Sequence, residues 1–504
     1  MERAEFKNLI NGILITTRNY QVKRAIMLST YDPDETKLIC LDVAKLQKVP
    51  VYLGRPHGLS KYSWATNQFN AMHIGENNPV SLLNHILENN EVGAIYLLED
   101  FIQYFQEPSV RSTASELLDS TVHNHHRTTA KLVVFIDSPS MSQHIPEMLR
   151  AKIQVIPHSL PKTSELLPII SAYIGNSDPS VYSKIAASLT GLTSTKARIS
   201  LREALTQGKE RLEVVISRLQ ALKEEILAKE LGMYLLPELN SEDSPIGLDH
   251  VWRYLEKNRK RIAISGKDRA RGILFVGPPG VGKSMIAKAI GKALKLPVIN
   301  FEVGRLISSL LGATENNVIR ATSTIDSLSP VVVFIDEIEK SLAGAESSGQ
   351  TDGGTMARSY GTLLSWLNDT MAPVFVIGTA NRLDKLGEFG STLCRKGRFD
   401  EIFFVDYPDS TARYQILEKE IQRFAPDTEI NCHTLADETD GFSGADLVAI
   451  VKEAYSEANF GNEKLGIQHL KEEIQILKPR VEVRKEEFSR LRRWAQSNCR
   501  LANH

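Results

Sequence analysis

The amino-acid sequence predicts an α/β protein made of two similar halves, each with a mostly parallel sheet followed by helices. At 504 residues the chain is too long for a single hydrophobic core and should divide into about three or four domains. In both halves, short runs of β-branched and aliphatic residues alternate with segments of helical periodicity, which is typical of parallel strands joined by helices. The halves also repeat one order of strands, because VVVFIDE, APVFVIGTAN and EIFFVDYP in the second correspond to AIYLLEDF, KLVVFIDSP and KIQVIPHSLP in the first. We therefore expect a duplicated module.

The composition favours a globular protein without a nucleic-acid partner. Hydrophobic residues make up 42% and charged residues 24% of the chain, and a net charge of -1 gives no electrostatic reason to expect nucleic acid. The four cysteines lie far apart with no CxxC pair, so neither a disulfide framework nor a zinc module is expected. The sequence shows no run of about 18 apolar residues and no signal-peptide pattern. We therefore expect no membrane insertion and a cytoplasmic location.

Residues 1–157 are predicted to form an α/β domain, and residues 158–240 a helical, lid-like domain with a linker. The expected strands are Gly12–Thr17, Lys37–Val43, Ala94–Leu98, Lys131–Asp137 and Lys152–Ile156. Helical periodicity marks Pro79–Asn89 and Ser109–Leu118, and helix formers dominate from Lys162 to Leu236. The sequence TTRNYQVKRAIM, which includes the end of the first expected strand, has no glycine turn and no Lys-Ser pair. We therefore expect this half to bind no nucleotide there.

Residues 241–410 are predicted to form the second α/β domain, and residues 411–504 a helical lid with further C-terminal helices. A polar joint, Asn240–Pro245, separates this half from the first. The expected strands are Gly272–Val276, Val298–Phe301, Val331–Ile335, Val374–Gly378 and Ile402–Val405.

A phosphate-binding loop is predicted at Gly277–Ser284. Its sequence, GPPGVGKS, follows an apolar strand, precedes the helical run Met285–Leu294 and fits G-x-x-x-x-G-K-[ST]. Glycines let successive N–H groups converge on phosphates at the positive end of a helix, and Lys283 adds a charge for the β- and γ-phosphates. The Ser284 hydroxyl is a ligand of the kind that Mg²⁺ prefers. The expected ATP contacts are Pro279, Gly280, Val281, Gly282, Lys283, Ser284 and Met285.

Two carboxylates and an amide are predicted to complete the chemistry. Asp336 and Glu337 end a buried strand some fifty residues after the phosphate loop. Asp336 would hold Mg²⁺, and Glu337 would orient and polarise the attacking water, because phosphoryl transfer depends on positioning and charge stabilisation. Asn381, after the next strand, is a candidate polar sensor of the water or the γ-phosphate.

Five motifs together make residues 245–460 resemble the AAA family in its narrow sense: GPPGVGKS, FIDE, GTAN, RKGRFDE and GFSGADL. The resemblance implies the P-loop NTPase (AAA+) fold, a parallel sheet with a C-terminal helical lid, preceded here by a degenerate AAA-like half. It implies that the active form is a homo-oligomer, with a hexamer as the expected ring, in which Arg395 and Arg398 reach the γ-phosphate of the neighbouring subunit. It also places Ile246 and Gly247 on one side of the adenine, with Gly444 and Ala445 on the other.

At finer grain the whole chain resembles the AAA family known as hypothetical chloroplast reading frame forty-six. This resemblance implies a role in regulating photosynthesis or inorganic-carbon use, and the plastid stroma as the location of plastid-encoded members. One departure concerns the central pore, where related unfoldases carry an aromatic residue and this sequence has Leu310. The departure favours a regulatory ATPase over a machine that threads polypeptides.

Three functions are compatible with these motifs. We expect an ATP-hydrolysing protein that remodels or regulates an unidentified protein partner. The first alternative is an ATP-binding assembly scaffold with little turnover, against which Glu337, Arg395 and Arg398 argue, since a pure binder has no need of them. The second is a nucleic-acid remodelling ATPase, which the net charge disfavours.

Overall fold

The computed structural model divides the chain into two compact units. Unit 1 comprises Met1–Ile226 with Ile319–Ser327, and unit 2 comprises Leu227–Val318 with Leu328–His504. Within them the structure describes residues 3–19, 23–74, 76–89, 91, 93–119, 130–175, 178–208, 212–237, 245–308, 314–340, 355–382, 393, 395 and 397–503. Of the helices in these ranges, none has the length and apolar character needed to cross a membrane.

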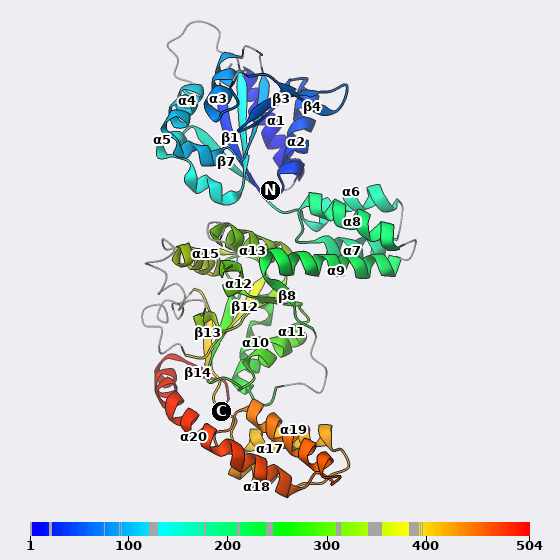
Figure 1. Ribbon diagram of the computed structural model, residues 1–504, viewed down its shortest axis with the longest axis vertical. Coiled ribbons are helices and arrows are strands. Elements are labelled where there is room, and N and C mark those ends of the chain that lie inside the picture. Colours follow the sequence, from blue (N-terminus) through cyan, green and yellow to red (C-terminus); the bar gives the residue numbers. More distant parts are fainter. Residues whose placement is uncertain are drawn as a thin grey trace. The chain divides into compact units, whose positions relative to one another are not determined.

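The α/β part of unit 1 is built on a seven-stranded sheet in the order β4-β3-β2-β5-β6-β1-β7 (Figure 1). Five strands are parallel: β1 (Lys23–Thr30), β2 (Val51–Arg55), β5 (Ala94–Glu99), β6 (Lys131–Asp137) and β7 (Ile153–His158). An antiparallel hairpin of β3 (Gly58–Ser63) and β4 (Gln68–Met72) extends one edge. β1 lies between the parallel strands β6 and β7, so the carboxyl ends of these three strands lie next to one another. In α/β sheets, ligands bind at the carboxyl ends of parallel strands.

Helices cover both faces of this sheet. On one face α1 (Arg3–Asn19) and α2 (Pro33–Gln47) pack on a core that includes Phe6, Ile10 and Ile39. On the other face lie α3 (Pro79–Glu88), the 3₁₀ helix η1 (Ile102–Gln106), α4 (Pro108–Leu118), η2 (Pro139–His144) and α5 (Glu147–Arg150). The helical part that follows has its own core and comprises α6 (Thr163–Ile174), α7 (Pro179–Leu189), α8 (Ser194–Gly208) and α9 (Leu212–Leu231).

Two strands predicted in the first half are wrong. Gly12–Thr17 lies in α1 and Lys37–Val43 lies in α2. In α1 the buried side chains recur at helical spacing, at Ile10, Ile13, Leu14 and Thr17, and α2 shows the same period. A short apolar run cannot by itself distinguish a strand from a buried helix face. The first strand is instead Lys23–Thr30, which the prediction missed, whereas the predictions at β5, β6 and β7 are confirmed.

Unit 2 contains a second seven-stranded sheet, in the order β14-β13-β9-β12-β11-β10-β8. Its strands are β8 (Met233–Leu235), β9 (Gly272–Val276), β10 (Val298–Phe301), β11 (Val331–Ile335), β12 (Val374–Ala380), β13 (Glu401–Phe404) and β14 (Arg500–Leu501). All except β8 run parallel. The five predicted strands are confirmed as β9 to β13. The helices of this unit are α10 (Asp249–Ile262), α11 (Lys283–Leu294), α12 (Val303–Ser308) and α15 (Thr355–Asp369). Most of α13 (Thr314–Leu328) is assigned to unit 1, as Ile319–Ser327.

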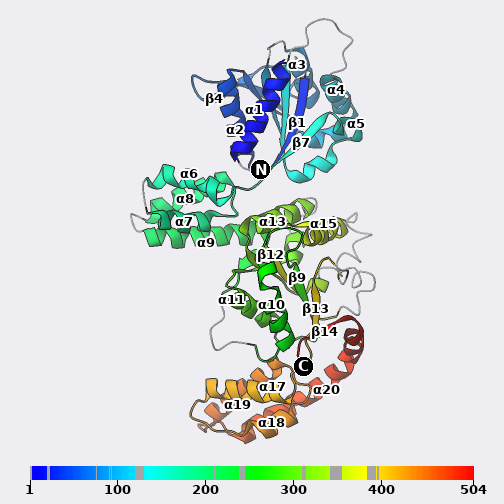
Figure 2. The same cartoon turned by 180° about the vertical axis from the view of Figure 1, so that it is seen from behind.

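A separate helical lid follows the sheet. Its helices are α17 (Ser410–Phe424), α18 (Cys432–Glu438), α19 (Gly444–Phe460) and the long α20 (Ile467–Asn498), and they share one core (Figure 2). The predicted helical lid is thus confirmed. The expectation of helices up to the C-terminus is wrong, because the chain leaves α20 and returns to the sheet as β14, which pairs with β13.

Candidate nucleotide-binding site

The predicted phosphate loop joins β9 to α11 and is shaped by its glycines. Gly280 and Gly282 have φ values of 83° and 90°, a left-handed backbone that other residues adopt only at a cost. At Gly277 a side chain could not fit, because a Cβ atom would lie 2.1 Å from the Val405 carbonyl oxygen. Lys283 then begins α11, so the loop ends at a helix N-terminus, the part of a helix that attracts anions.

Lys283 is held inside this loop rather than extended into solvent. Its Nζ donates to the carbonyl oxygens of Gly277 and Pro278, each at 2.8 Å, and to Asn381 Oδ1 at 2.7 Å. Burial lowers the pKa of Lys283 to about 8, although the carboxylates of Glu339, Asp336 and Glu337 oppose the shift. The amine is therefore a desolvated donor, poised at the mouth of the phosphate loop.

The two carboxylates at the end of β11 are oriented by Thr379 on the neighbouring strand β12. The Thr379 hydroxyl donates to Asp336 Oδ1 at 2.5 Å and accepts a hydrogen bond from the Glu337 backbone N–H at 2.8 Å. Glu337 has a φ of 47°, in the left-handed region, where a residue other than glycine costs about 1–3 kcal/mol. Its Oε2 lies 2.5 Å from Lys340 Nζ. The other oxygen, Oε1, accepts a hydrogen bond from Asn381.

Asn381 connects the lysine to the carboxylates. Its Nδ2 donates to Glu337 Oε1 at 2.9 Å while its Oδ1 accepts from Lys283. Its backbone N–H donates to Glu339 Oε1 at 2.9 Å. A single side chain therefore links the Lys283 amine to the Glu337 carboxylate.

Glu339 and Thr379 belong to this network, and the sequence analysis missed both. Glu339 is only 7% exposed, and its Oε2 is buried with no hydrogen-bond partner among the described residues. Burial raises the pKa of Glu339. An acidic residue three positions after Asp336, on the first turn that follows the strand, was an available signal. Thr379 offered none beyond its place in the strand.

A cavity of about 360 Å³ lies beside the phosphate loop, and the lid borders it. Seven residues predicted to contact nucleotide line it: Ile246, Gly280, Val281, Gly282, Met285, Gly444 and Ala445. Gly247 lies between two residues that border the cavity, Ile246 and Leu248. Ile416 and Val448 of the lid add apolar wall, and Lys419 and Arg423 add positive charge. The volume falls within the range of about 300–1,000 Å³ that small-molecule sites occupy.

The lid is joined directly to the phosphate loop. Ser443 caps α19 in a reciprocal pair with Asp446, which fixes the start of that helix. The Ala445 N–H donates to the Gly280 carbonyl oxygen at 3.0 Å. A Cβ at Gly280 would lie 2.7 Å from Ser443 Oγ, so the close approach requires glycine.

The C-terminal segment supports the opposite wall of the cavity. The Leu248 N–H donates to Asn503 Oδ1 at 2.9 Å, and the His250 N–H donates to the Ala502 carbonyl at 3.2 Å. Leu248 has a φ of 72°, an unusual conformation for leucine. Asn503 also lines the cavity itself. The sequence analysis missed Asn503, because nothing near it in the sequence indicates that it returns to Leu248.

The remaining predicted residues lie outside this network. Arg395 is exposed and Arg398 half-buried, and the described lining of the cavity includes neither. Burial, together with the charge of Arg395, lowers the pKa of Arg398. Pro279 is part of the loop, and Leu310 falls outside the described residues.

The residues present fit a nucleotide with Mg²⁺. Ser284 at the start of α11 and Asp336 at the end of β11 are both exposed, and both offer the oxygen ligands that Mg²⁺ prefers. Lys283 and the helix N-terminus supply positive charge for phosphates, and the adjoining cavity has apolar walls suited to a base.

Comparison with known proteins agrees with this geometry. The family model "ATPase family associated with various cellular activities (AAA)" matches residues 273–407, and the "AAA+ lid domain" model matches residues 429–459. The chain is 30% identical to the AAA domain-containing protein ycf46 of Trieres chinensis, over 88% of this chain and 90% of the relative. It is 29% identical to ycf46 of Pyropia yezoensis, over 86% and 89%. It is 30% identical to ycf46 of Guillardia theta, over 84% of each. At these shares the similarity extends into both halves of the chain.

Proposed function

The chain belongs to the ycf46 family of AAA domain-containing proteins, and on that premise we propose that it hydrolyses ATP to ADP and phosphate. The observation that carries the proposal is the hydrogen-bonded connection from Lys283 through Asn381 to Glu337. A protein that only bound ATP would need the phosphate loop, but it would not need a carboxylate held by a sensor beside it. The network therefore favours turnover over the scaffold alternative.

Lys283 has the role of binding and neutralising the phosphates. Its amine donates to two neutral carbonyls and one amide oxygen, which phosphate oxygens would replace as stronger, charged acceptors. Ser284 and Asp336 would hold Mg²⁺, which would supply further neutralisation of the phosphate charge. Thr379 keeps the Asp336 carboxylate oriented for that purpose.

Glu337 orients and polarises the water that attacks the γ-phosphate. Asn381 fixes one carboxylate oxygen, and Lys340 pairs with the other. The hydrogen bond with Glu337 raises the pKa of Lys340. As phosphates draw Lys283 away from Asn381, the amide oxygen becomes available to the water or the γ-phosphate. Asn381 would thereby report the presence of the γ-phosphate to Glu337.

Arg395 and Arg398 act in the site of a neighbouring subunit. Both precede β13, outside the described lining of the cavity in their own chain. A guanidinium supplied by a neighbour stabilises charge on the transferring phosphoryl group and makes hydrolysis depend on assembly. The active form is accordingly a homo-oligomer, with a hexamer as the expected ring.

ATP hydrolysis by this protein serves to remodel or regulate a protein partner. The near-zero net charge gives little electrostatic attraction for nucleic acid. The resemblance to a chloroplast reading-frame family makes control of photosynthesis or inorganic-carbon use the field in which to seek that partner. It also favours the cytoplasm, or the plastid stroma where the gene is plastid-encoded.

The test of ATPase activity uses Glu337→Gln and a matched control, Glu302→Gln. Loss of a residue that polarises the attacking water costs about 100- to 10,000-fold in turnover. We expect Glu337→Gln to lose turnover to that extent while it still binds ATP. Glu302 is an exposed carboxylate of unit 2 that lies 3.8 Å from Arg305, a long ion pair, so its variant should match the wild type. Wild-type turnover in Glu337→Gln would contradict the role given to Glu337.

Two further experiments address assembly and partner. Subunits with Arg398→Ala, mixed with Glu337→Gln subunits, should recover some turnover, because a mixed interface can combine an intact Glu337 with an intact Arg398. Absence of recovery in demonstrably mixed oligomers argues against a shared site. Capture with the ATP-locked Glu337→Gln protein, compared with a Lys283→Ala protein that binds no ATP, should retain the partner only in the first case.

A further inference from the structure

One carboxylate in the wall of the cavity beside the phosphate loop has no part in the hydrolysis proposed above. Glu420 lies on the lid helix α17 and borders this cavity. It is 6% exposed, and its Oε2 atom is buried without a hydrogen-bond partner among the described residues. A buried polar atom that makes no hydrogen bond costs free energy, so we expect Glu420 to have a role that offsets this cost.

Arg423 balances the charge of Glu420 but does not satisfy its hydrogen bonds. The Arg423 Nη1 atom lies 3.9 Å from Glu420 Oε2, which is an ion-pair distance but too long for a hydrogen bond. The Arg423 side chain is also 55% exposed, and ion pairs of exposed side chains contribute little to stability. The ion pair therefore leaves Oε2 as an unused acceptor on a residue of the cavity wall.

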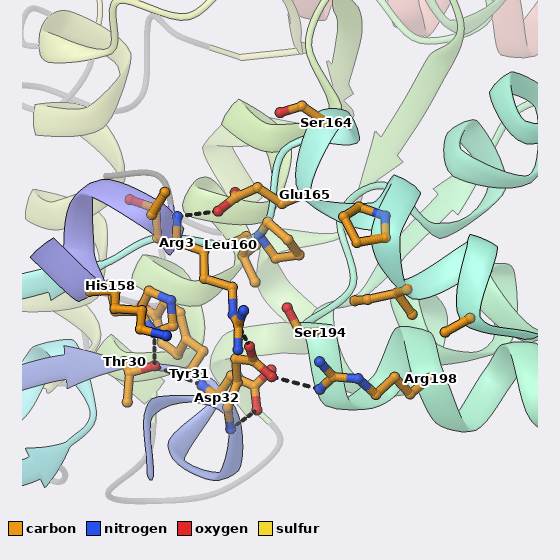
Figure 3. A pocket seen from close by; sticks show the side chains of 18 of the residues that line it. Arg3, Thr30, Tyr31, Asp32, His158, Leu160, Ser164, Glu165, Ser194 and Arg198 are labelled. Carbon is orange, nitrogen blue, oxygen red and sulfur yellow. Dashed lines mark hydrogen bonds and ion pairs between the residues drawn. The ribbon is translucent and has the colours of Figure 1, made fainter. Parts of the chain in front are cut away.

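The carboxylates around the cavity of about 730 Å³ in unit 1 differ from Glu420, because other side chains satisfy them (Figure 3). Glu35 accepts hydrogen bonds from Arg3 Nε and Arg198 Nη1, each at 2.6 Å. Asp32 accepts from the Thr195 N–H at 2.9 Å and from Thr195 Oγ1 at 2.6 Å. Figure 3 shows Arg3, Asp32 and Arg198 close together at this cavity. These carboxylates are satisfied within the protein and indicate no ligand.

Among the described residues, the buried carboxylate oxygens that lack a hydrogen-bond partner belong to Glu339 and Glu420 alone. Both residues lie at the candidate nucleotide site, Glu339 in contact with the backbone N–H of Asn381 and Glu420 in the cavity wall. Unused buried acceptors are rare in folded proteins. Their occurrence at one site indicates that the ligand of this site supplies the partner of Glu420.

The chemistry of a carboxylate restricts which part of ATP can be that partner. A carboxylate accepts hydrogen bonds and donates none. The phosphates are themselves negatively charged acceptors, and they bind at the loop, where Lys283 and the start of α11 attract them. The donors of ATP are the two ribose hydroxyls and the adenine amine. The ribose suits Glu420 best, because two neighbouring hydroxyls offer two donors to one carboxylate, and acidic residues bind ribose in this way in dinucleotide-binding proteins.

We propose that Glu420 is a specificity-determining residue, which accepts hydrogen bonds from the ribose hydroxyls of ATP and makes the site select ribonucleotides over deoxyribonucleotides. The inference rests on the proposed ATP chemistry. The adenine then lies against the apolar wall that includes Ile246, Met285 and Val448. Because Glu420 belongs to the lid and the phosphate loop belongs to the sheet, a bound ribonucleotide joins the two, and a deoxyribonucleotide joins them less tightly.

The test measures binding by titration calorimetry to the full-length Glu337→Gln protein, which retains its ligands without hydrolysing them. The ligands are ATP, 2′,3′-dideoxyATP, which lacks both hydroxyls, and purine riboside triphosphate, which lacks the amine. A hydrogen bond to a charged group corresponds to a difference in Kd of about tenfold or more. We therefore expect dideoxyATP to bind at least about tenfold more weakly than ATP.

Glu420→Met, made in the Glu337→Gln protein, keeps most of the side-chain volume and removes the acceptors. The ratio of the Kd for dideoxyATP to that for ATP should fall to about one, whereas the ratio for purine riboside triphosphate to ATP should not change. A role of Glu420 in folding alone would weaken all three ligands alike and leave both ratios unaltered. The matched control is Glu418→Met on the same helix, since Glu418 accepts from Tyr414 Oη at 2.7 Å and the described lining of the cavity does not include it. Its ratios should equal those of the parent.

A second variant, Glu420→Gln, keeps the shape of the side chain and one acceptor oxygen, and it tests the proposal if Glu420→Met does not fold. Because its acceptor is neutral, the dideoxyATP ratio should fall to about threefold. The proposal is overturned if the parent binds ATP and dideoxyATP equally, if the Glu420 variants keep the full ratio, or if they change the purine riboside ratio instead. Failure of the parent to bind ATP at all would contradict the proposed function itself, whereas equal binding of ATP and dideoxyATP contradicts only this inference.

Discussion

Asp32 should hold the two parts of unit 1 together, and Asp32→Ala measures how strongly. The carboxylate accepts from the Glu35 N–H at 3.2 Å, the Thr195 N–H at 2.9 Å and Thr195 Oγ1 at 2.6 Å. Loss of an N-cap costs about 0.5–2 kcal/mol. A hydrogen bond to a charged group contributes about 1.5–3 kcal/mol. The two Thr195 donors are only half-buried and regain water in part, so we expect a total near 4 kcal/mol rather than the full sum.

Hydrogen–deuterium exchange of the full-length protein can divide this loss between the two helices. A local loss of about 3 kcal/mol at the start of α8 corresponds to about 150-fold faster exchange of its first-turn amides, at about 1.4 kcal/mol per factor of ten. The start of α2 should lose about tenfold in protection. The control is Asp34→Ala, in the same turn of α2, because Asp34 is 65% exposed and has one ion pair with Lys37. Exposed pairs contribute about 0–1 kcal/mol. Equal exchange of α8 in the two variants would refute the reasoning.

Three further predictions concern individual groups. Asn381→Ala removes a hydrogen bond to the Glu337 carboxylate, at about 1.5–3 kcal/mol, so steady-state turnover should fall about 10- to 150-fold; an unchanged rate contradicts the sensor role. Asn503→Ala frees the Leu248 N–H and should raise the Kd for ATP about 2- to 12-fold, as a fluorescent nucleotide would report; equal affinity would remove Asn503 from the site. Burial raises the pKa of Asp137 to about 6, so unit 1 should lose stability as pH rises from about 4 through 6. Asp137→Asn should flatten that part of the pH profile in thermal unfolding, and an unaltered slope excludes Asp137 as its source.

The sign of the Asp137 effect follows from where its proton is bound more tightly. The folded protein binds the proton with a pKa of about 6, above the ordinary value of 3.8. The favourable contribution is therefore complete below the ordinary pKa and is lost as pH rises through the folded pKa. Glu35 behaves in the opposite way. Its lowered pKa contributes stability that is present at neutral pH and lost as pH falls below the ordinary carboxyl range.

The second half of the chain was more predictable than the first because its strands β9, β11 and β12 are buried throughout and end at recognisable motifs. Val331–Ile335 is apolar throughout and ends at Asp336, so both the strand and its carboxyl edge could be predicted. In the first half, Gly12–Thr17 and Lys37–Val43 are short apolar runs without such boundaries. Both segments are helical, and only their packing against the sheet shows which of their residues are buried. The intrinsic strand propensity of a short segment predicts its structure poorly where tertiary contacts decide between helix and strand.

In the candidate site, too, some residues could be predicted from the sequence and one contact could not. Lys283 and Ser284 belong to one contiguous motif, and Asp336 ends a strand at a recognisable distance from it. Asn381 could be predicted as a strand-end amide but not as the link between Lys283 and Glu337. That link depends on β9, β11 and β12 lying side by side, in a strand order that differs from the order along the chain.

By itself, the sequence determined the parts of this protein whose geometry is local. The glycine loop before α11, the paired carboxylates after β11 and the cap of α19 follow from residues a few positions apart, because backbone dihedrals and helix starts convert close spacing into fixed geometry. Tertiary structure alone decided the contacts between distant segments. Asn503 reaches Leu248 across 255 positions, and Asp32 reaches Thr195 across 163. Such contacts arise when separate hydrophobic faces pack and bring unrelated loops together, and the residues involved carry no signal of their partner in their own neighbourhood.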